Sequence, residues 1–412
     1  TILADEADLP IDPLTDQPNQ PCPNCHSTHL IPEADVMDTW ATSSLSPQIV
    51  GQWAFSESLQ NNALYEQTYP FSLRPQAHEI IRTWAFYTIA KSWLHFGTLP
   101  FTSVAISGWG LAPTGAGKIS KSKKSDVAGP LEMIEQYSAD AVRYWAASTG
   151  LGKDAIINEE KIQAGAKLVN KLWNVARFCS RFLEDWRLET GDFANSNPIS
   201  NLQSPVSLTL ADRWLLAHTQ QLIERSTKLY EQYDYATAKS EIEQFFWQIL
   251  ADNYLEMAKL RLYEGGPSSE GARYALHHAL LTTLKLLAPI LPFVTEQIYQ
   301  GIFAENDGSD SIHTSAWPVG NGAWGDETAV LHGNELVEIA TAVRRYKSEQ
   351  NLSLGAELAC LHLQTNDAEF ATHLQTAITD LTSITRAKKI MLENSNEVGN
   401  GRWQLHIQAE EE

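Results

Sequence analysis

Cysteine and long apolar runs are both scarce in this chain of 412 residues. The four cysteines are Cys22, Cys25, Cys179 and Cys360, and only the first two are close in sequence. A disulfide framework is therefore not expected. No uninterrupted run of about 18 apolar residues occurs, and the first residues lack the basic and apolar regions of a secretory leader. We expect no membrane segment and a cytoplasmic location.

Basic residues are also few, with 30 Lys and Arg against 50 Asp and Glu and a formal net charge of −20. Such a charge opposes binding of a polyanion by the whole surface. A nucleic acid would have to bind at local basic clusters, although each cluster taken alone is more typical of an exposed, solubilising surface. The candidate clusters are residues 118–124, Lys153 with Lys161 and Lys167, Arg344-Arg345 with Lys347, and Arg386 with Lys388-Lys389.

The composition is sufficient for several domains, because 43% of the residues are hydrophobic and the length allows about two to four cores. Residues 1–34 are polar, Pro-rich between Asp8 and Pro23 and weakly periodic, which indicates a linker. The chain also begins without Met. We expect it to be the C-terminal portion of a longer protein.

Residues 35–150 are typical of an α/β domain. An apolar pattern at 78–96 predicts a buried helix, and the β-branched run 102–106 predicts a buried parallel strand before a glycine-rich segment. This order fits the second half of a Rossmann-like nucleotide-binding domain, in which ligands gather at the carboxyl ends of the strands.

Residues 151–325 have helical periodicity and predict an antiparallel bundle that begins at the cap Asn158. Trp173 and Phe178 are predicted to face its core. Residues 326–412 predict a small α+β domain, so the whole fold is mainly α with an α/β part. The expected elements are helices at 211–233, 236–263, 271–290, 293–303, 335–348 and 368–378, and strands at 358–363, 384–392 and 403–407.

The string Cys22-Pro23-Asn24-Cys25-His26 is a C-x-x-C knuckle. It supplies two thiolates, whereas tetrahedral Zn²⁺ takes four ligands. Three interpretations stay open: half of a zinc site whose partner pair lies elsewhere, a vestigial turn, or a redox pair.

A lysine loop, defined as residues 118–124, carries Lys118, Ser120, Lys121 and Ser122 behind the glycines at 108 and 110. Ammonium groups neutralise a polyphosphate, and hydroxyl and backbone N–H groups supply directional donors. Taken alone, such a run is also typical of a solvated loop.

Three strings in this order and spacing resemble the valyl-tRNA synthetases, a family of class I aminoacyl-tRNA synthetases. They are Asp38-Thr39-Trp40-x-x-Ser43-Ser44, Arg74-Pro75-x-x-His78-Glu79-Ile80-Ile81-Arg82-Thr83-Trp84, and the lysine loop, which resembles the second signature loop of class I enzymes. Ile119 and Lys123-Lys124-Ser125 depart from the commoner residues of that loop. The helical part, including 171–178 and 287–296, resembles the anticodon-binding bundle of the same family.

The resemblance implies roles for individual residues. Trp40 and Trp84, with Asp38, would form the amino-acid pocket, since rigid rings can shape a small apolar cavity. His78 and Glu79 would contact the adenylate, and Gly108 with Trp109 would lie along the adenine ring. Lys118 and Lys121 would be catalytic and, with Ser120 and Ser122, would bind the ATP phosphates. Without the motifs, these tryptophans would be typical core residues and His78-Glu79 a typical helix start.

The function that the resemblance implies is ATP-dependent attachment of valine to its tRNA through a valyl-adenylate. The implied partners are valine, ATP with Mg²⁺, the valine-accepting tRNA and the upstream half of the same enzyme, and the cysteine pair adds Zn²⁺ as a candidate. The first signature motif and the editing domain are not in this chain, so we expect no activity from it alone. Two alternatives remain, a fragment of an isoleucyl-tRNA synthetase and a non-catalytic tRNA-binding module.

Overall fold

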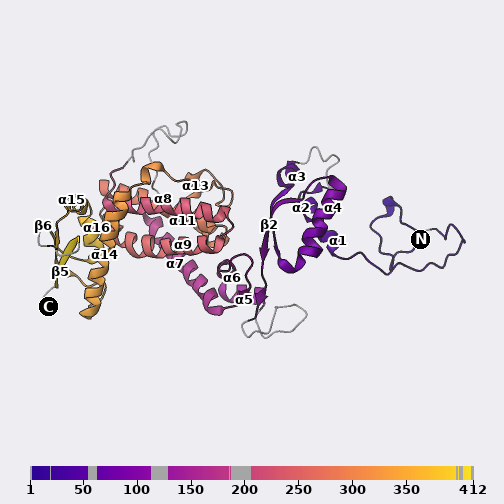
Figure 1. The fold of residues 1–412 in the computed structure, drawn as a ribbon, viewed down its shortest axis with the longest axis horizontal. Helices are drawn as coiled ribbons and strands as arrows, with labels where there is room; N and C mark the ends of the chain where they lie inside the picture. Colours follow the sequence, from indigo (N-terminus) through magenta and orange to yellow (C-terminus); the bar gives the residue numbers. More distant parts are fainter. Residues whose placement is uncertain are drawn as a thin grey trace. The chain divides into compact units, whose positions relative to one another are not determined.

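The computed structural model describes residues 2–18, 20–53, 63–112, 129–184, 186, 206–395, 398 and 402–409. It divides the chain into two compact units, Thr1–Gly108 and Trp109–Glu412, which we describe separately. Most described residues are helical and the sheets are small (Figure 1). The prediction of a mainly α fold with an α/β part is confirmed.

The first unit is built on two parallel strands joined by a helical connection. The strands pair in register from Phe71 opposite Phe101 to Ala77 opposite Ser107. Both the strand predicted at 102–106 and the helical character of 78–96 are confirmed. The elements are α1 (Trp40–Ser43), α2 (Ser46–Val50), α3 (Ala63–Thr68), β1 (Phe71–Ala77), η4 (His78–Ile80), the π-helical η5 (Ile81–Phe86), α4 (Tyr87–Phe96) and β2 (Phe101–Ser107).

The sequence pattern does not reveal β1. The residues that it buries are the polar Arg74 and Gln76, and Pro75 stands between them. An apolar alternation is the usual signal of a half-buried strand, and proline argues against a strand interior. A strand whose buried face is polar therefore escapes recognition.

The helix at 78–96 is less buried than its sequence predicts. Ile81, Phe86 and Trp93 are 47%, 58% and 60% exposed. The buried stripe consists of the small residues Ala85, Thr88 and Ser92, which recur at helical spacing. Within the described residues this helix contacts the short helix α1 and, through Ser92, Gln48 of α2. It therefore buries one narrow face.

The second unit begins with short strands and two helices that are anchored on the bundle. Strand β3 pairs in parallel with β4. The carboxylate of Asp140 accepts hydrogen bonds from the backbone N–H groups of Phe293 (3.3 Å) and Val294 (2.7 Å) at the start of α12 (Pro292–Ile302). The elements are β3 (Gly110–Leu111), α5 (Pro130–Tyr137), α6 (Ala139–Ala146) and β4 (Ala155–Ile156).

The helical bundle has one continuous apolar core. The predicted cap is confirmed, because Asn158 Oδ1 accepts from the Lys161 N–H at 3.0 Å. The segment expected as one helix at 236–263 contains a π-helical stretch. The elements are α7 (Glu159–Leu183), α8 (Leu210–Glu231), α9 (Tyr235–Gln244), the π-helix η6 (Phe245–Tyr254), α10 (Leu255–Glu264), α11 (Pro267–Leu287), α12 (Pro292–Ile302), α13 (Ala304–Asp307) and α14 (Glu327–Glu349).

One core prediction for the bundle is wrong. Trp173 is 44% exposed, whereas Phe178 packs against the core. The buried stripe of α7 runs through Leu168, Leu172 and Val175, and Trp173 lies beside that stripe.

The C-terminal part is a three-stranded sheet with two helices, whereas the sequence predicts three strands with one helix at 368–378 between them. Strand β5 lies between β6, to which it is parallel, and β7, to which it is antiparallel. The prediction of a strand at 384–392 is wrong over 384–389, because Ile384 and Thr385 end a helix and the strand begins at Ile390. The elements are β5 (Leu358–Thr365), α15 (Ala368–Thr376), α16 (Ile378–Thr385), β6 (Ile390–Asn394) and β7 (Trp403–Ala409).

A buried ion network joins this part to the bundle. The Arg261 guanidinium lies 2.7 Å from Asp212 Oδ1 and 2.6 Å from Asp380 Oδ1. Tyr254 donates to Asp212 at 2.7 Å, and Thr209 donates to Asp380 at 2.9 Å. The apolar core is shared as well, because Phe370 and Leu381 belong to the core of the bundle. None of the helices in the described residues combines the length and apolar character of a membrane span.

Candidate functional site

The first predicted site lies where β1 and β2 end. His78 directly follows β1, and its Nδ1 is 3.4 Å from the carbonyl oxygen of Ser107, the last residue of β2. The carboxyl ends of parallel strands meet at one edge, which is where nucleotide ligands bind in open α/β sheets. The helix start predicted at His78 and Glu79 is confirmed, and both side chains are exposed.

The predicted adenine segment falls at the boundary between the two units. Gly108 directly follows β2 and ends the first unit, and Trp109 begins the second. Within the second unit, the Trp109 N–H donates to Asp154 Oδ1 at 2.8 Å, and the Trp109 carbonyl accepts from the Ala155 N–H at 2.7 Å. Asp154 therefore fixes the start of β3 beside β4.

The amino-acid pocket was predicted from two strings about 40 residues apart, and the structure brings their elements together. The Trp84 indole Nε1 donates to the carbonyl of Ser43 at 2.7 Å. Helix α1, which begins at Trp40, contacts both η5 and α4. Asp38 Oδ1 accepts from the Trp40 N–H at 3.0 Å, so Asp38 fixes the first turn of α1. Trp40 and Trp84 thus stand on adjoining elements.

Arg74 is a neighbour of Trp84 that the sequence interpretation missed. It is 3% exposed, and its guanidinium lies over the Trp84 ring, 3.4 Å from the ring centroid. A second ring, that of Phe101, lies 5.7 Å away. Burial lowers the pKa of Arg74. Its position inside the second string was the available signal, but the string does not show that the cation is buried.

The lysine loop, with Lys118, Ser120, Lys121 and Ser122, lies outside the described residues. Its flanks are described: β3 ends at Leu111 and α5 begins at Pro130.

The cysteine knuckle is a tight turn. The Cys22 N–H donates to the Ser27 carbonyl and the His26 N–H to the Cys22 carbonyl, with His26 in the left-handed region. Backbone hydrogen bonds from Cys25 and Asn24 lower the pKa of the Cys22 thiol. The described residues contain no group of three or more His, Cys, Asp or Glu that could hold a metal. A four-ligand zinc site therefore does not fit the residues that are placed.

The basic clusters predicted from sequence differ in how far the structure exposes them to solvent. The prediction that Lys347 belongs to a surface cluster is wrong, because its side chain is 2% exposed. Its Nζ donates to the carbonyls of Leu354, Ala356 and Thr385 at 2.6–3.1 Å. Arg345, two residues earlier, is exposed and pairs with Glu349. Lys153, Lys161 and Lys167 are exposed.

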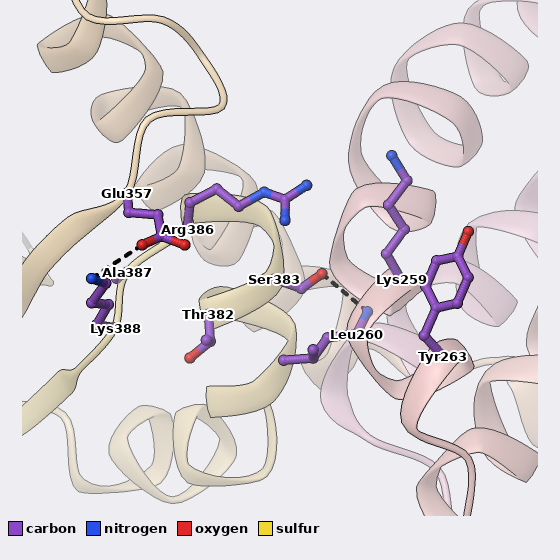
Figure 2. A pocket seen from close by; sticks show the side chains of 9 residues that line it. All are labelled: Lys259, Leu260, Tyr263, Glu357, Thr382, Ser383, Arg386, Ala387 and Lys388. Atoms are coloured by element: carbon purple, nitrogen blue, oxygen red, sulfur yellow. Dashed lines mark hydrogen bonds and ion pairs between the residues drawn. The ribbon is translucent and has the colours of Figure 1, made fainter.

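The cluster at Arg386 and Lys388 lines a groove of about 320 Å³. Figure 2 shows Lys259 and Tyr263 of α10 on one wall and Arg386 on the other. Lys388 Nζ pairs with Glu357 at 3.1 Å, and the Ser383 hydroxyl accepts from the Leu260 N–H at 3.3 Å between the two walls. Three cations and one carboxylate line the groove, and Glu256 beside it pairs with Lys259. The lining itself is net positive in a protein that is otherwise acidic, so it suits an anion.

Two family models match the chain. The model described as "tRNA synthetases class I (I, L, M and V)" matches residues 13–158, and "Anticodon-binding domain of tRNA ligase" matches residues 212–363. The resemblance stated from the motif strings is confirmed.

Curated relatives agree with these models. The chain is 39% identical to the valine--tRNA ligase of Orientia tsutsugamushi over 95% of this chain and 45% of the relative. It is 40% identical to the valine--tRNA ligase of Methanopyrus kandleri, over 95% of this chain and 41% of the relative. The chain thus spans less than half the length of these relatives.

A solved structure supports the fold. The crystal structure of a LeuRS–tRNA–LeuAMS ternary complex from Agrobacterium radiobacter matches with a TM-score of 0.51 and 18% identity, over 74% of this chain and 35% of that chain.

Proposed function

We propose, from the premise that this chain belongs to the class I aminoacyl-tRNA synthetases, that it takes part in ATP-dependent attachment of valine to tRNA through a valyl-adenylate. The valine assignment follows from relatives 36–40% identical over about 95% of the chain. Because the chain spans less than half of their length, the activity of the whole enzyme is inferred from them. A cytoplasmic location is part of the same proposal.

The observation that carries the proposal is the edge of the first unit where His78 meets Ser107, next to Gly108. A nucleotide could meet an imidazole, a carboxylate from Glu79 and an approachable backbone at this edge. We assign His78, Glu79, Gly108 and Trp109 to ATP binding. Lys118, Ser120, Lys121 and Ser122 would bind its phosphates, and ATP would arrive with Mg²⁺.

The valine pocket is assigned to Trp40, Trp84 and Asp38. The hydrogen bond from Trp84 to Ser43 ties the ring to the helix that carries Trp40. A rigid aromatic wall excludes a longer aliphatic side chain, although one methylene is worth only about 1–3 kcal/mol of discrimination. Such a pocket would favour valine over isoleucine without rejecting isoleucine completely.

Pyrophosphate exchange with the full-length gene product tests the catalytic assignment. We expect exchange that depends on valine, and we expect Lys121→Ala to lower kcat by the equivalent of about 2–4 kcal/mol because charge on the leaving pyrophosphate loses a partner. Trp84→Phe should lower the ratio of valine activation to isoleucine activation. Trp93→Phe, at an exposed position of α4, should leave this ratio unchanged. Exchange driven better by isoleucine would favour the isoleucine enzyme.

We propose further that the groove lined by Lys259, Arg386 and Lys388 contacts the phosphate backbone of tRNA. In a chain of net charge −20, concentrated cations are required for such a contact. Arg386→Glu should weaken tRNA binding and reduce the salt slope by about one. Arg225→Glu, at an exposed ion pair outside the candidate clusters, should change neither. Filter binding at two salt concentrations measures both quantities. Retained tRNA binding without any exchange activity would favour the non-catalytic module.

A further inference from the structure

Arg74 is held in an unusual state in the first unit. It lies in β1 opposite Val104 of β2, on the face that also buries Gln76. With 3% exposure it is removed from water, yet its Nε and Nη2 have no hydrogen-bond partner among the described residues. Its guanidinium carbon lies 3.4 Å from the centroid of the Trp84 ring.

Stability alone does not account for this arrangement. A buried cation loses its hydration, and each unpaired N–H loses a hydrogen bond that water would have made. The attraction of the guanidinium to the ring face offsets part of that loss. A methionine at this position would fill similar space without the loss, so the structure accepts an unfavourable group beside Trp84.

The contact does restrain Trp84. The indole edge is fixed where Nε1 donates to the Ser43 carbonyl, and the guanidinium covers one ring face. A ring held at its edge and at one face cannot rotate or withdraw from a ligand. Functional side chains gain precision when neighbouring groups lock their rotamers in this way.

We propose that Arg74 is a positioning residue for Trp84 and that it sharpens selection of the aliphatic side chain of the amino-acid substrate. The inference rests on the proposed function, in which Trp84 walls the valine pocket. Arg74 acts through the ring and does not itself touch the substrate.

The test is pyrophosphate exchange by the full-length gene product carrying Arg74→Met or Arg74→Lys, with valine, isoleucine and ATP varied separately. For Arg74→Met we expect KM for valine to rise about tenfold and the valine-to-isoleucine ratio of kcat/KM to fall by a similar factor, with KM for ATP unchanged. Arg74→Lys keeps the charge but loses the planar group. Its valine-to-isoleucine ratio of kcat/KM should therefore lie between those of the wild type and Arg74→Met. Trp93→Phe serves as the control.

The outcomes separate the two proposals. Wild-type exchange with valine together with an unchanged ratio in Arg74→Met overturns the role of Arg74 and leaves the proposed function standing. Equal losses for valine and ATP in both variants, or failure of both to fold, would show that Arg74 is only structural. Absence of valine-dependent exchange in the wild type overturns both.

Discussion

Each of the two units buries an arginine, and the two residues are treated in opposite ways. Arg261 in the second unit is 1% exposed and meets two carboxylates and the Ser268 carbonyl. Arg74 in the first unit is 3% exposed and lies against aromatic rings, with two donors unpaired among the described residues.

Arg261 stabilises the fold through its ion pairs, whereas we propose that Arg74 positions a residue of the amino-acid site. A buried cation with complete partners is costly to remove, because its partners would be left buried and charged. A buried cation without partners can be replaced by an apolar residue at little cost. The comparison therefore predicts a large loss of stability from substitution of Arg261 by Met and little change from the same substitution of Arg74.

The largest effect is expected from Arg261→Met. The change leaves Asp212 and Asp380, whose side chains are fully buried, without their shared cation. We expect the free energy of unfolding to fall by about 3–5 kcal/mol, measured by urea denaturation. Arg225→Met, which breaks a pair that is about half exposed, should cost about 1 kcal/mol or less. Equal losses in the two variants would contradict a special role for the buried network.

Two buried histidines extend the comparison to groups that are uncharged when they are buried, and acid tests them. Burial lowers the pKa of His277 to about 4 and of His278 to about 3, and Asp307 and Lys285 are charged neighbours of His277. In the unfolded chain both rings titrate near 6.5. The unfolded state therefore binds more protons below that pH, and the stability that neutral rings provide is present above pH 6.5 and lost as pH falls toward 4. We expect a loss of about 2 kcal/mol per histidine between pH 7 and pH 5.

A variant isolates this contribution from that of the carboxylates. His278→Gln should reduce the slope of unfolding free energy against pH between 6.5 and 5. The histidines of the first unit, His26, His29, His78 and His95, are exposed, so His95→Gln should leave the slope unchanged. An identical slope in wild type and His278→Gln would show that His278 titrates normally.

The sequence predicts the helices of the second unit because their apolar residues recur at helical spacing and their ends carry recognisable caps such as Asn158. It predicts β2 for the same kind of reason, a β-branched run between Pro100 and Gly108. It fails at β1, where Arg74 and Gln76 occupy the buried face. Local pattern detects apolar burial and cannot detect a buried charge.

For the site, the motif strings predict which residues belong together, and the structure places α1 against η5 as they require. Contacts made across the fold could not be foreseen. Lys347 looks like part of a basic cluster, but its burial depends on carbonyls up to 38 residues away. The guanidinium of Arg74 over Trp84 is likewise a tertiary contact. The roles predicted for the site residues stay predictions.

A third, intermediate effect is expected from Lys347→Met. Its Nζ satisfies the carbonyls of Leu354, Ala356 and Thr385, and burial lowers its pKa. Like Arg261, it is a buried cation with complete partners, although these partners are neutral. Removal should lower the free energy of unfolding by about 2 kcal/mol because the carbonyls lose a charged donor. Arg345→Met on the same helix, which is exposed, should have little effect. An unchanged free energy of unfolding in Lys347→Met would mean that Lys347, like Arg74, contributes little to stability.

The smallest effect on stability is expected from Arg74→Met, the counterpart of Arg261→Met in the first unit. Methionine removes a buried cation whose Nε and Nη2 have no partner among the described residues, and it leaves no carboxylate behind. The lost attraction to the Trp84 ring and the relieved desolvation act in opposite directions. We therefore expect the midpoint of thermal unfolding to rise slightly or to stay within the equivalent of about 1 kcal/mol of the wild type. Calorimetry of Arg74→Met beside Arg261→Met measures the contrast directly. A loss at Arg74 as large as that at Arg261 would mean that both arginines stabilise their units, and the distinction between them would be lost.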